Sequence, residues 1–235
     1  MPKRIIVSGG TKGIGKAIVE LFAQKGYEVI TCSRSKERLD ALKKDIENRI
    51  PGANILVFKA DLAVKQEVLD FGQFIVGLGG SIDVLVNNTG LFIPGQIQNE
   101  ADGVLEQMIS TNVYSAYHLT RSLLPVFIGQ KKGDIFTICS TASFVAYTNG
   151  GSYCISKFAL YGMNKVLREE LKPYGVRVVS VLPGATLTSS WEGVDIPAER
   201  FMKPEDVAES IWSAHQLSKN TVVEELLLRP QLGDL

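Results

Sequence analysis

The feature that most constrains the fold is a regular alternation between short β-branched runs and longer amphipathic segments. The runs occupy residues 4–8, 28–32, 54–59, 83–87, 134–139, 177–182 and 222–228. Helix-length segments lie between them, such as 14–25, in which apolar residues recur at helical spacing. Strands separated by helices imply right-handed crossovers and therefore a parallel sheet that is covered on both faces.

The run Val178-Val179-Ser180-Val181-Leu182 does not alternate between apolar and polar residues, which is typical of a strand buried on both faces. Neither a repeat nor a linker interrupts the 235 residues. We therefore predict an α/β fold: a single doubly wound, Rossmann-type domain over residues 1–235, with a parallel sheet of about seven strands. In such folds the ligand crevice lies at the carboxyl ends of the strands.

Charge and composition exclude several classes of partner. Because 25 Lys and Arg balance 25 Asp and Glu, we expect neither nucleic acid nor an anionic membrane surface as a partner. The apolar runs are shorter than a membrane helix requires, and the N-terminal one lacks the pattern of a signal peptide. Three cysteines (Cys32, Cys139 and Cys154) favour no disulfide framework, and with two histidines we expect no metal site. These features predict a cytoplasmic protein.

A glycine-rich turn follows the first run and precedes a helical pattern: Ser8-Gly9-Gly10-Thr11-Lys12-Gly13-Ile14-Gly15. Glycines permit a tight turn and let the backbone approach a pyrophosphate at the positive N-terminus of a helix. A simple turn would also explain them, but the strand–turn–helix context favours a dinucleotide site. Its candidate residues are Gly9, Thr11, Lys12, Gly13, Ile14 and Gly15.

The end of the second run distinguishes NADP from NAD. NAD sites place an acidic residue about 20 positions beyond the glycines, whereas Cys32-Ser33-Arg34-Ser35-Lys36 contains none. Arg34 and Lys36 are predicted to open a helix, where the macrodipole disfavours positive charge. A nearby 2′-phosphate would offset that cost, with Lys12 as a second cation; a solvated basic helix start is the alternative. We favour NADP(H), bound by Ser33 and Arg34.

Polar residues also end the third and fourth runs. Asp61 follows the third, and Asn87-Asn88-Thr89-Gly90 follows the fourth. Local capping alone is the alternative explanation of each, because Asp and Asn favour helix starts and turns. They nonetheless lie on the same side of the sheet as the glycine turn. The candidate contacts to the cofactor here are the Asp61 carboxylate, Leu62, the Asn88 backbone and Gly90.

Tyr153 and Lys157 lie four residues apart, so they share one face of a predicted helix. A phenol with its ordinary pKa near 10 is a poor catalyst at neutral pH, but a neighbouring ammonium stabilises the phenolate. Ser140 is placed at the end of the fifth run, where its hydroxyl can hold a substrate carbonyl. Asn112 lies in a helix predicted over 102–128, which is a poor position for asparagine. Each residue alone is more often structural; their combination behind a dinucleotide turn points to catalysis.

These motifs resemble those of the short-chain dehydrogenase/reductase family over essentially the whole chain. The matching segments are 8–15, 87–90, Ser140, Tyr153-Cys154-Ile155-Ser156-Lys157 and Pro183-Gly184. Two departures are small: Ser8 replaces Thr and keeps its hydroxyl, and Thr89 replaces Ala. The resemblance implies that Tyr153 is the general acid, Lys157 a ribose ligand that modifies its pKa, Ser140 the substrate orienter and Asn112 the anchor of a proton-relay water. It also implies cofactor contacts from Pro183, Gly184 and Thr188.

Within the family, segments 190–195 and 202–207 and the C-terminal ending are similar to those of bacterial sepiapterin reductases. The resemblance implies an NADPH-dependent carbonyl reductase acting on a pterin side-chain ketone, under a short substrate lid at about 185–203. Trp191 either stacks on a flat substrate or anchors the lid, with equal weight. The candidate substrate contacts are Ser140, Phe144, Tyr147, Tyr153, Leu187 and Trp191.

Two alternatives to this function remain open from the sequence. A 3-hydroxy acid (serine-type) or 3-oxoacyl dehydrogenase is the second choice; a substrate carboxylate would need a cation, and 185–199 has none. A non-catalytic nucleotide-binding regulator is disfavoured by the complete catalytic set. We also expect a homodimer or homotetramer, with helices 102–128 and 152–171 as its interface, although Leu119, Leu123 and Phe127 equally suit an internal core.

Overall fold

The computed structural model describes residues 2–191, 193 and 195–234, and these residues form a seven-stranded parallel sheet. The strands are β1 (Arg4–Ser8), β2 (Glu28–Ser33), β3 (Asn54–Lys59), β4 (Val84–Asn87), β5 (Gly133–Ile138), β6 (Val176–Pro183) and β7 (Glu225–Leu228). Their order across the sheet is β3-β2-β1-β4-β5-β6-β7. The predicted α/β, doubly wound, Rossmann-type architecture is confirmed.

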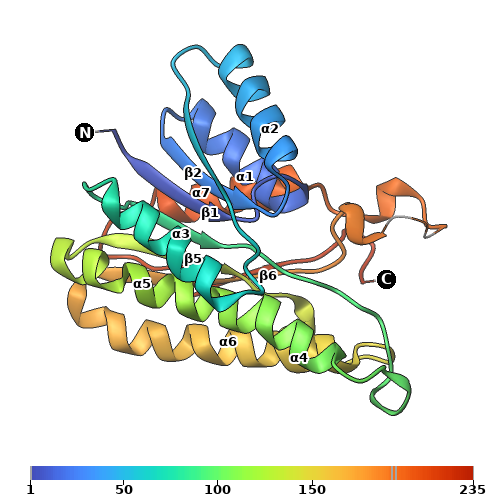
Figure 1. Ribbon diagram of the computed structural model, residues 1–235. Helices are drawn as coiled ribbons and strands as arrows, with labels where there is room; N and C mark the ends of the chain where they lie inside the picture. The colour runs from blue at the N-terminus through green and yellow to red at the C-terminus, as the bar shows by residue number, and fades with distance from the viewer. Residues whose placement is uncertain (1, 192, 194, 235) are drawn as a thin grey trace.

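Helices cover both faces of the sheet (Figure 1). They are α1 (Gly13–Gln24), α2 (Lys36–Arg49), α3 (Lys65–Gly77), α4 (Val104–Ile109), α5 (Ser115–Gln130), α6 (Gly151–Leu171) and α7 (Pro204–His215). One layer contains α1, α2 and α7, and the other contains α3, α5 and α6. None of the helices in the described ranges is long and apolar enough to cross a membrane.

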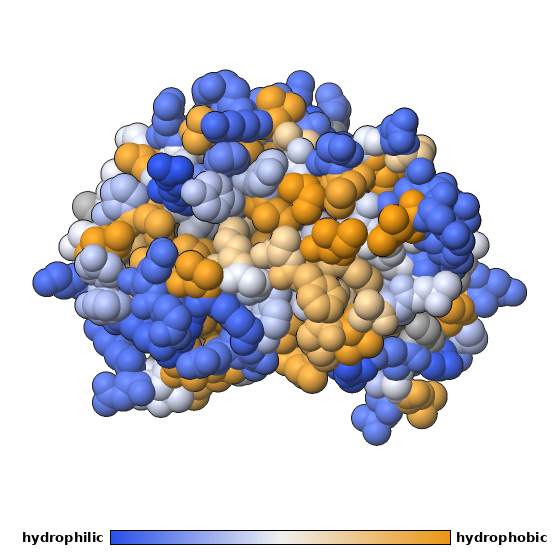
Figure 2. Space-filling model, turned by 90° about the horizontal axis from the view of Figure 1, so that it is seen from below, coloured by the Kyte–Doolittle hydropathy of each residue, from blue (hydrophilic) through white to orange (hydrophobic). Residues whose placement is uncertain are grey.

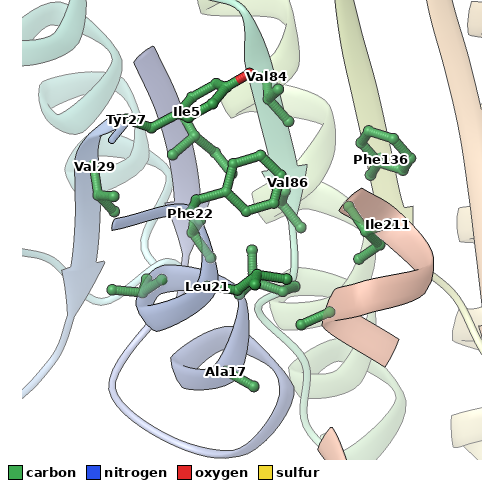
Figure 3. Close-up of a cluster of buried hydrophobic side chains, with 14 of the residues drawn as sticks. Ile5, Ala17, Leu21, Phe22, Tyr27, Val29, Val84, Val86, Phe136 and Ile211 are labelled. Carbon is green, nitrogen blue, oxygen red and sulfur yellow. The ribbon is translucent and has the colours of Figure 1, made fainter. Parts of the chain in front are cut away.

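The two covered faces explain why the strands are apolar at successive positions. In β1, Ile5 and Val7 belong to the core cluster under α1 and α7, whereas Ile6 belongs to the cluster under α3 and α5. Figure 3 shows the first cluster around Phe22, which is fully buried. Its ring packs edge-on against Trp212 of α7, with 5.3 Å between the centroids. Such packing on both faces fixes the register of each strand.

Two predicted elements differ in their bounds by more than one residue. The helix predicted over 102–128 begins at Val104 and is interrupted by a π-helical turn at Ser110–Tyr114, between α4 and α5. The last strand begins at Glu225 and not at residue 222. Val222 and Val223 pack on the core without joining the ladder, and the Thr221 carbonyl just before them accepts a hydrogen bond from the Arg177 guanidinium at 3.2 Å.

The chain reverses its direction of travel across the sheet between β1 and β4, which are neighbours. At such a switch point the loops leaving the two strands diverge and open a crevice at their carboxyl ends. The loops that follow β1, β4, β5 and β6 all start at this edge. It therefore collects the glycine turn, Asn88, Ser140 and Gly184 from four distant parts of the sequence.

Candidate active site

The glycine turn between β1 and α1 has the backbone geometry of a phosphate cradle. Gly9 and Gly13 have positive φ angles of 71° and 48°, which residues with a Cβ rarely adopt. A Cβ on Gly15 would lie 2.4 Å from the Gly9 carbonyl oxygen, so only glycine fits where the turn meets the helix. Lys12 occupies the N-cap of α1 without a side-chain cap, which leaves the first helical N–H groups for another acceptor.

Asn88 fastens this turn to the end of β4. Its side-chain nitrogen donates to the carbonyl oxygens of Ser8 (2.9 Å) and Gly9 (3.0 Å). The Ser8 hydroxyl oxygen accepts from the backbone N–H groups of Asn88 and Thr89, at 2.9 and 3.0 Å. Serine therefore makes the contacts that need a hydroxyl at this position. The Thr89 hydroxyl is buried beside Gly9 and has no hydrogen-bond partner among the described residues.

The end of β2 presents one unengaged cation. Thr11 Oγ1 donates to Ser33 Oγ at 3.1 Å, which joins the glycine turn to this strand end. Ser35 caps α2, so the helix begins at Lys36 and Arg34 lies outside it, contrary to the prediction. Lys36 is occupied by an i, i+4 ion pair on the helix surface. Within the described ranges, Arg34 is exposed and has no hydrogen-bond or ion-pair partner.

The residues predicted to contact the adenine lie at the same edge of the sheet, and two of them already make contacts within the protein. Asp61 Oδ1 accepts from the Ala63 N–H at 3.0 Å. This is the local capping contact that is the alternative to cofactor binding for Asp61. The Leu62 side chain is buried in the core, so only its backbone can face a ligand. Gly90 is exposed, and a Cβ there would lie 3.7 Å from Lys157 Nζ. The adenine pocket itself stays a prediction.

The Lys157 ammonium is buried at the carboxyl end of β5. The residue is 4% exposed, and its Nζ donates to the Ile138 carbonyl oxygen at 2.9 Å. In the described part of the chain no carboxylate forms an ion pair with it. Nζ lies 5.7 Å from the centroid of the Tyr153 ring, one helical turn earlier on α6. A buried ammonium without a counter-ion is costly, which marks this position as a site for a polar ligand.

Ser140 lies two residues beyond β5, so the prediction that it ends the strand is wrong. The ladder stops at Ile138 because Ser140 begins a capped 3₁₀ turn, Thr141–Ser143. Ser140 Oγ accepts from the Ala142 N–H at 3.1 Å, and its own N–H donates to Ser143 Oγ at 3.2 Å. Since Oγ acts as the acceptor in this cap, its hydroxyl proton remains available to a substrate oxygen.

Asn112 sits in the π-helical turn and is fully buried. Its Oδ1 accepts from the Leu91 N–H at 2.6 Å, and its Nδ2 donates to the Leu91 carbonyl (3.0 Å) and to Ser156 Oγ (2.8 Å). The side chain therefore joins the loop after Gly90 to α6. These contacts explain an asparagine inside a helical segment, since π turns occur at functional sites. With its amide engaged, anchoring of a relay water would fall to the backbone and stays a prediction.

Aromatic and aliphatic side chains border the reacting residues. Phe144, after the Ser140 turn, and Leu187, after β6, are 40% and 44% exposed. Phe92 packs edge-on against the Tyr153 ring, with 4.8 Å between the centroids. Phe92 was not predicted from the sequence, although it lies only two residues beyond the Asn-Asn-Thr-Gly segment.

Tyr147 lies beside the N-terminus of α6, in the wall of a groove of about 720 Å³. Ile97, Ile155 and Phe158 line the same groove, on the side of α6 that faces outward. Burial raises the pKa of the Tyr147 phenol, and the neighbouring Tyr153 and Cys154 add to the shift, so the phenol is neutral at physiological pH. Tyr147 is thus near Tyr153, on the outer margin of the site.

The predicted lid is closed at its base by a pair of backbone hydrogen bonds. The Leu187 N–H donates to the Met202 carbonyl at 2.9 Å, and the Met202 N–H donates to the Ala185 carbonyl at 3.0 Å. Trp191 packs on Phe201, with 5.0 Å between the ring centroids. That contact is the one expected of a lid anchor. Residues 192 and 194, which belong to the sequence segment compared above, lie outside the described residues.

The lid also meets the glycine turn. A Cβ on Gly13 would lie 2.9 Å from the Thr188 methyl carbon, so the two loops approach closely. Between them is a hollow of about 500 Å³, lined in part by Thr11, Lys12 and Lys16. Gly184 follows Pro183 at the end of β6, and its N–H donates to the Leu228 carbonyl at 2.8 Å. Of the cofactor residues predicted at 183–188, Thr188 therefore lies against the glycine turn, whereas Gly184 packs against the C-terminal segment.

Three further residues at the site have no local sequence signal. Glu100 caps α6: its carboxylate accepts from the Ser152 N–H at 2.8 Å and from the Ser152 hydroxyl. Ser156 supports Asn112, and Arg229 lies over the Phe144 ring. Each contact joins residues 44 to 85 positions apart, which a local pattern does not reveal. Next to Ser140, burial raises the pKa of the Cys139 thiol to about 12, so this thiol stays protonated.

Comparisons with known proteins agree with this arrangement. A family model described as short chain dehydrogenase matches residues 3–196. A sepiapterin reductase of Chlorobaculum tepidum is 32% identical over 98% of this chain and 97% of the relative.

Two solved structures extend the comparison. A metagenomic short-chain oxidoreductase in complex with NADP is 27% identical and has a TM-score of 0.85, with 97% of both chains covered. A serine dehydrogenase from Escherichia coli is 28% identical and has a TM-score of 0.81, with coverage of 95% of this chain and 96% of the other.

Proposed function

Because the chain belongs to the short-chain dehydrogenase/reductase family, we propose that it is an NADPH-dependent carbonyl reductase. The observation that supports this most is the buried Lys157 ammonium, which has one backbone acceptor and lies beside the Tyr153 ring. A buried charge of this kind costs stability unless a ligand completes its contacts. It therefore argues for a bound polar ligand at this position, and the complete set of Asn112, Ser140, Tyr153 and Lys157 disfavours a non-catalytic nucleotide-binding regulator.

The cofactor is NADP(H), and the residues present fit it. The turn at Gly9 and Gly13 leaves backbone N–H groups of α1 without a side-chain cap, so they can bind a pyrophosphate. After the end of β2, where an NAD site has an acidic residue, this chain has the exposed Arg34. We assign the cofactor contacts to Gly9, Thr11, Lys12, Gly13, Ile14, Gly15, Ser33, Arg34, Asp61, Leu62, Asn88, Gly90, Tyr153, Lys157, Pro183, Gly184 and Thr188.

The catalytic roles follow from these positions. NADPH held by these residues would supply the hydride that reduces the carbonyl carbon. Tyr153 donates the proton of its Oη to the carbonyl oxygen, and Ser140 Oγ–H donates a hydrogen bond to the same oxygen. Lys157 holds the ribose hydroxyls and stabilises the phenolate that remains on Tyr153. Asn112 keeps α6 and the loop after Gly90 in register through its bonds to Leu91 and Ser156.

As substrate we propose a ketone on the side chain of a flat heterocycle, of which a pterin is the leading case. Two facts support this choice. The similarity to a sepiapterin reductase extends over 98% of the chain. The exposed side chains of Phe144 and Leu187 border the opening to the reacting residues, which we call the mouth of the site. The proposed substrate contacts are Ser140, Phe144, Tyr147, Tyr153, Leu187 and Trp191. The lid is segment 185–203, within a single domain of residues 1–235.

A 3-oxo acid or 3-hydroxy acid is the second candidate substrate class. The lid itself offers no cation between 185 and 199, but Arg229 reaches the mouth from the end of β7, with its guanidinium carbon 5.9 Å from the Phe144 ring centroid. The 28% identity with a serine dehydrogenase agrees with this class.

A turnover assay that follows NADPH oxidation tests the proposal. The substrate panel contains sepiapterin, a small diketone and a 3-oxo acid, with NADH as the matched cofactor control. We expect reduction of at least one ketone, faster with NADPH than with NADH. Absence of turnover on the whole panel would refute carbonyl reduction; reduction of every ketone except sepiapterin would refute only the pterin.

We also propose a homodimer or homotetramer in the cytoplasm. Figure 2 views the molecule from below Figure 1, where α6 is lowest, and apolar residues gather across the middle of that face. Five apolar or aromatic side chains of this region are 42% to 56% exposed: Tyr114 in the π turn, Tyr117 on α5, and Ile155, Phe158 and Val166 on α6. Leu119, Leu123 and Phe127 are core residues. Light scattering at micromolar concentration is expected to show an oligomer, and a monomer would contradict this.

The proposed location in the cytoplasm is supported by the cysteines, which are free and buried, as is usual in a reducing compartment.

A further inference from the structure

Arg229 is a cation at the substrate mouth that comes from outside the lid. It follows the last residue of β7, and the Leu228 carbonyl before it accepts from the Gly184 N–H at 2.8 Å. Its guanidinium carbon lies 5.9 Å from the centroid of the Phe144 ring. Phe144 follows the turn that Ser140 caps, and Gly184 follows β6. The guanidinium thus lies between the two loops that carry the proposed substrate and cofactor contacts.

The C-terminal segment folds back over the same place. The Gly233 N–H donates to the Pro230 carbonyl at 2.9 Å, which closes a turn after β7. A Cβ on Gly184 would lie 2.9 Å from Asp234 Oδ1 and 3.2 Å from Pro230 Cδ. Figure 1 shows the C-terminus beside the lid, at the carboxyl-terminal edge of the sheet. The tail therefore packs against the loop after β6, where the lid begins.

Asp234 is the partner that Arg229 has in the described residues, through an ion pair between Nη1 and Oδ2. The two side chains are 38% and 41% exposed, and an exposed pair of this kind adds little to stability. Arginine presents five N–H donors in a planar fork, of which this pair uses a minority. Donors therefore remain on Arg229 for a second carboxylate, and the first is readily replaced.

We propose that Arg229 binds an anionic group of the substrate, a carboxylate, and that Asp234 is a tethered counter-ion which the incoming carboxylate displaces. The ring of Phe144 supports the guanidinium by cation–π contact, and the N–H groups that Asp234 does not use are the donors for the substrate carboxylate. The substrate class that Arg229 would select is the second candidate named above, a 3-oxo acid, whose carboxylate lies near the reacting carbonyl; a pterin ketone has no carboxylate for this site. This inference rests on the proposed carbonyl reduction and is independent of the pterin.

A substrate pair that differs only in charge tests the proposal: acetoacetate and methyl acetoacetate, each assayed with NADPH. In Arg229→Gln we expect kcat/KM for acetoacetate to fall at least ten-fold, mainly through KM, while the value for the ester stays within about two-fold. In Asp234→Asn we expect kcat/KM for acetoacetate to rise, because the competing carboxylate is gone. Lys219→Gln, which removes one exposed charge elsewhere, is the matched control.

The outcomes separate this inference from the proposal beneath it. Equal losses on both substrates in Arg229→Gln, or a lower Tm in that variant, would mean that the pair only holds the tail, and would overturn the inference. Loss confined to acetoacetate with an unchanged Tm supports it. If the wild-type enzyme reduces neither compound nor any ketone of the earlier panel, carbonyl reduction fails and the inference falls with it.

Discussion

Each end of strand β5 has a buried charged side chain nearby, and the two differ in whether the protein itself supplies a counter-ion. At its amino end, the Asp134 carboxylate is 3% exposed and accepts two hydrogen bonds from the Arg177 guanidinium, at 2.7 and 2.6 Å. His215 Nδ1 lies 2.5 Å from the same carboxylate, and Tyr27 hydrogen-bonds the other side of that imidazole at 2.7 Å. Every polar group in this cluster is matched to another from the protein.

At the carboxyl end of the same strand, the equally buried Lys157 ammonium has the Ile138 carbonyl as its acceptor and, in the described ranges, no carboxylate. The first arrangement is complete by itself and fastens α7 and the loop before β7 to the sheet. The second is incomplete until a ligand arrives. In folded proteins, buried charged groups without a counter-ion are found chiefly where function requires them. The contrast between Asp134 and Lys157 therefore points to the active site without reference to any sequence motif.

The largest expected effect is on stability, at the amino end. Asp134→Ala leaves the Arg177 guanidinium buried without its carboxylate, which is expected to lower the free energy of unfolding by about 3–5 kcal/mol. Urea unfolding measures this, with Asp45→Ala as the control because that carboxylate pairs on an exposed helix surface. A loss no greater than that of the control would show that the cluster is not the structural clamp described above.

At the carboxyl end, Tyr153→Phe removes the transferable proton but keeps the ring against Phe92. Turnover is expected to fall by about 100-fold or more, with little change in stability or in NADPH binding. Tyr161→Phe, on the same helix but bonded to Glu225 at the surface, is the matched control and should keep its activity. Substantial turnover in Tyr153→Phe would require another proton donor.

Cofactor choice is expected to depend on Arg34. Arg34→Asp places a negative charge where the 2′-phosphate is proposed to lie, and should weaken NADPH binding by about 2 kcal/mol, or about 30-fold in Kd. Arg38→Asp, an exposed charge reversal on α2, controls for long-range electrostatics. Fluorescence titration with NADPH and NADH measures both. If the wild-type protein binds the two cofactors equally, the role given to Ser33 and Arg34 is wrong.

The smallest effect concerns the lid. Trp191→Ala should raise KM for a pterin ketone by about 2- to 13-fold, the equivalent of the 0.5–1.5 kcal/mol that aromatic stacking contributes, and should change KM for a small diketone less. Steady-state kinetics on both substrates measure the difference. Equal changes would assign Trp191 wholly to its packing on Phe201.

What the sequence predicts well is what local periodicity determines. The strand bounds came out within a few residues because both faces of the sheet are buried, and the Tyr153–Lys157 pair meets on α6 because helical geometry places it there. The π turn escaped prediction, because it depends on bonds from Asn112 to Leu91 and Ser156, which lie 21 and 44 residues away.

The mouth was the least predictable region for the same reason. Arg229 and Phe144 are brought together only when β7 joins the edge of the sheet, 85 positions later in the chain. Ser140 was placed in a strand because the apolar Cys139 before it continues the strand pattern, whereas the cap that ends the ladder uses the side chains of Ser140 and Ser143. Contacts between distant loops leave no periodic signal.

The most direct test of the contrast between the two ends is Lys157→Met, with unfolding and turnover measured on the same preparation. Methionine keeps the length of the side chain and removes the uncompensated charge. We predict an unchanged or higher free energy of unfolding, because replacing a buried ion by an apolar side chain is often neutral or stabilising, together with loss of nearly all reductase activity. A loss of stability as large as that of Asp134→Ala would show that Lys157 is a structural residue and would contradict the account.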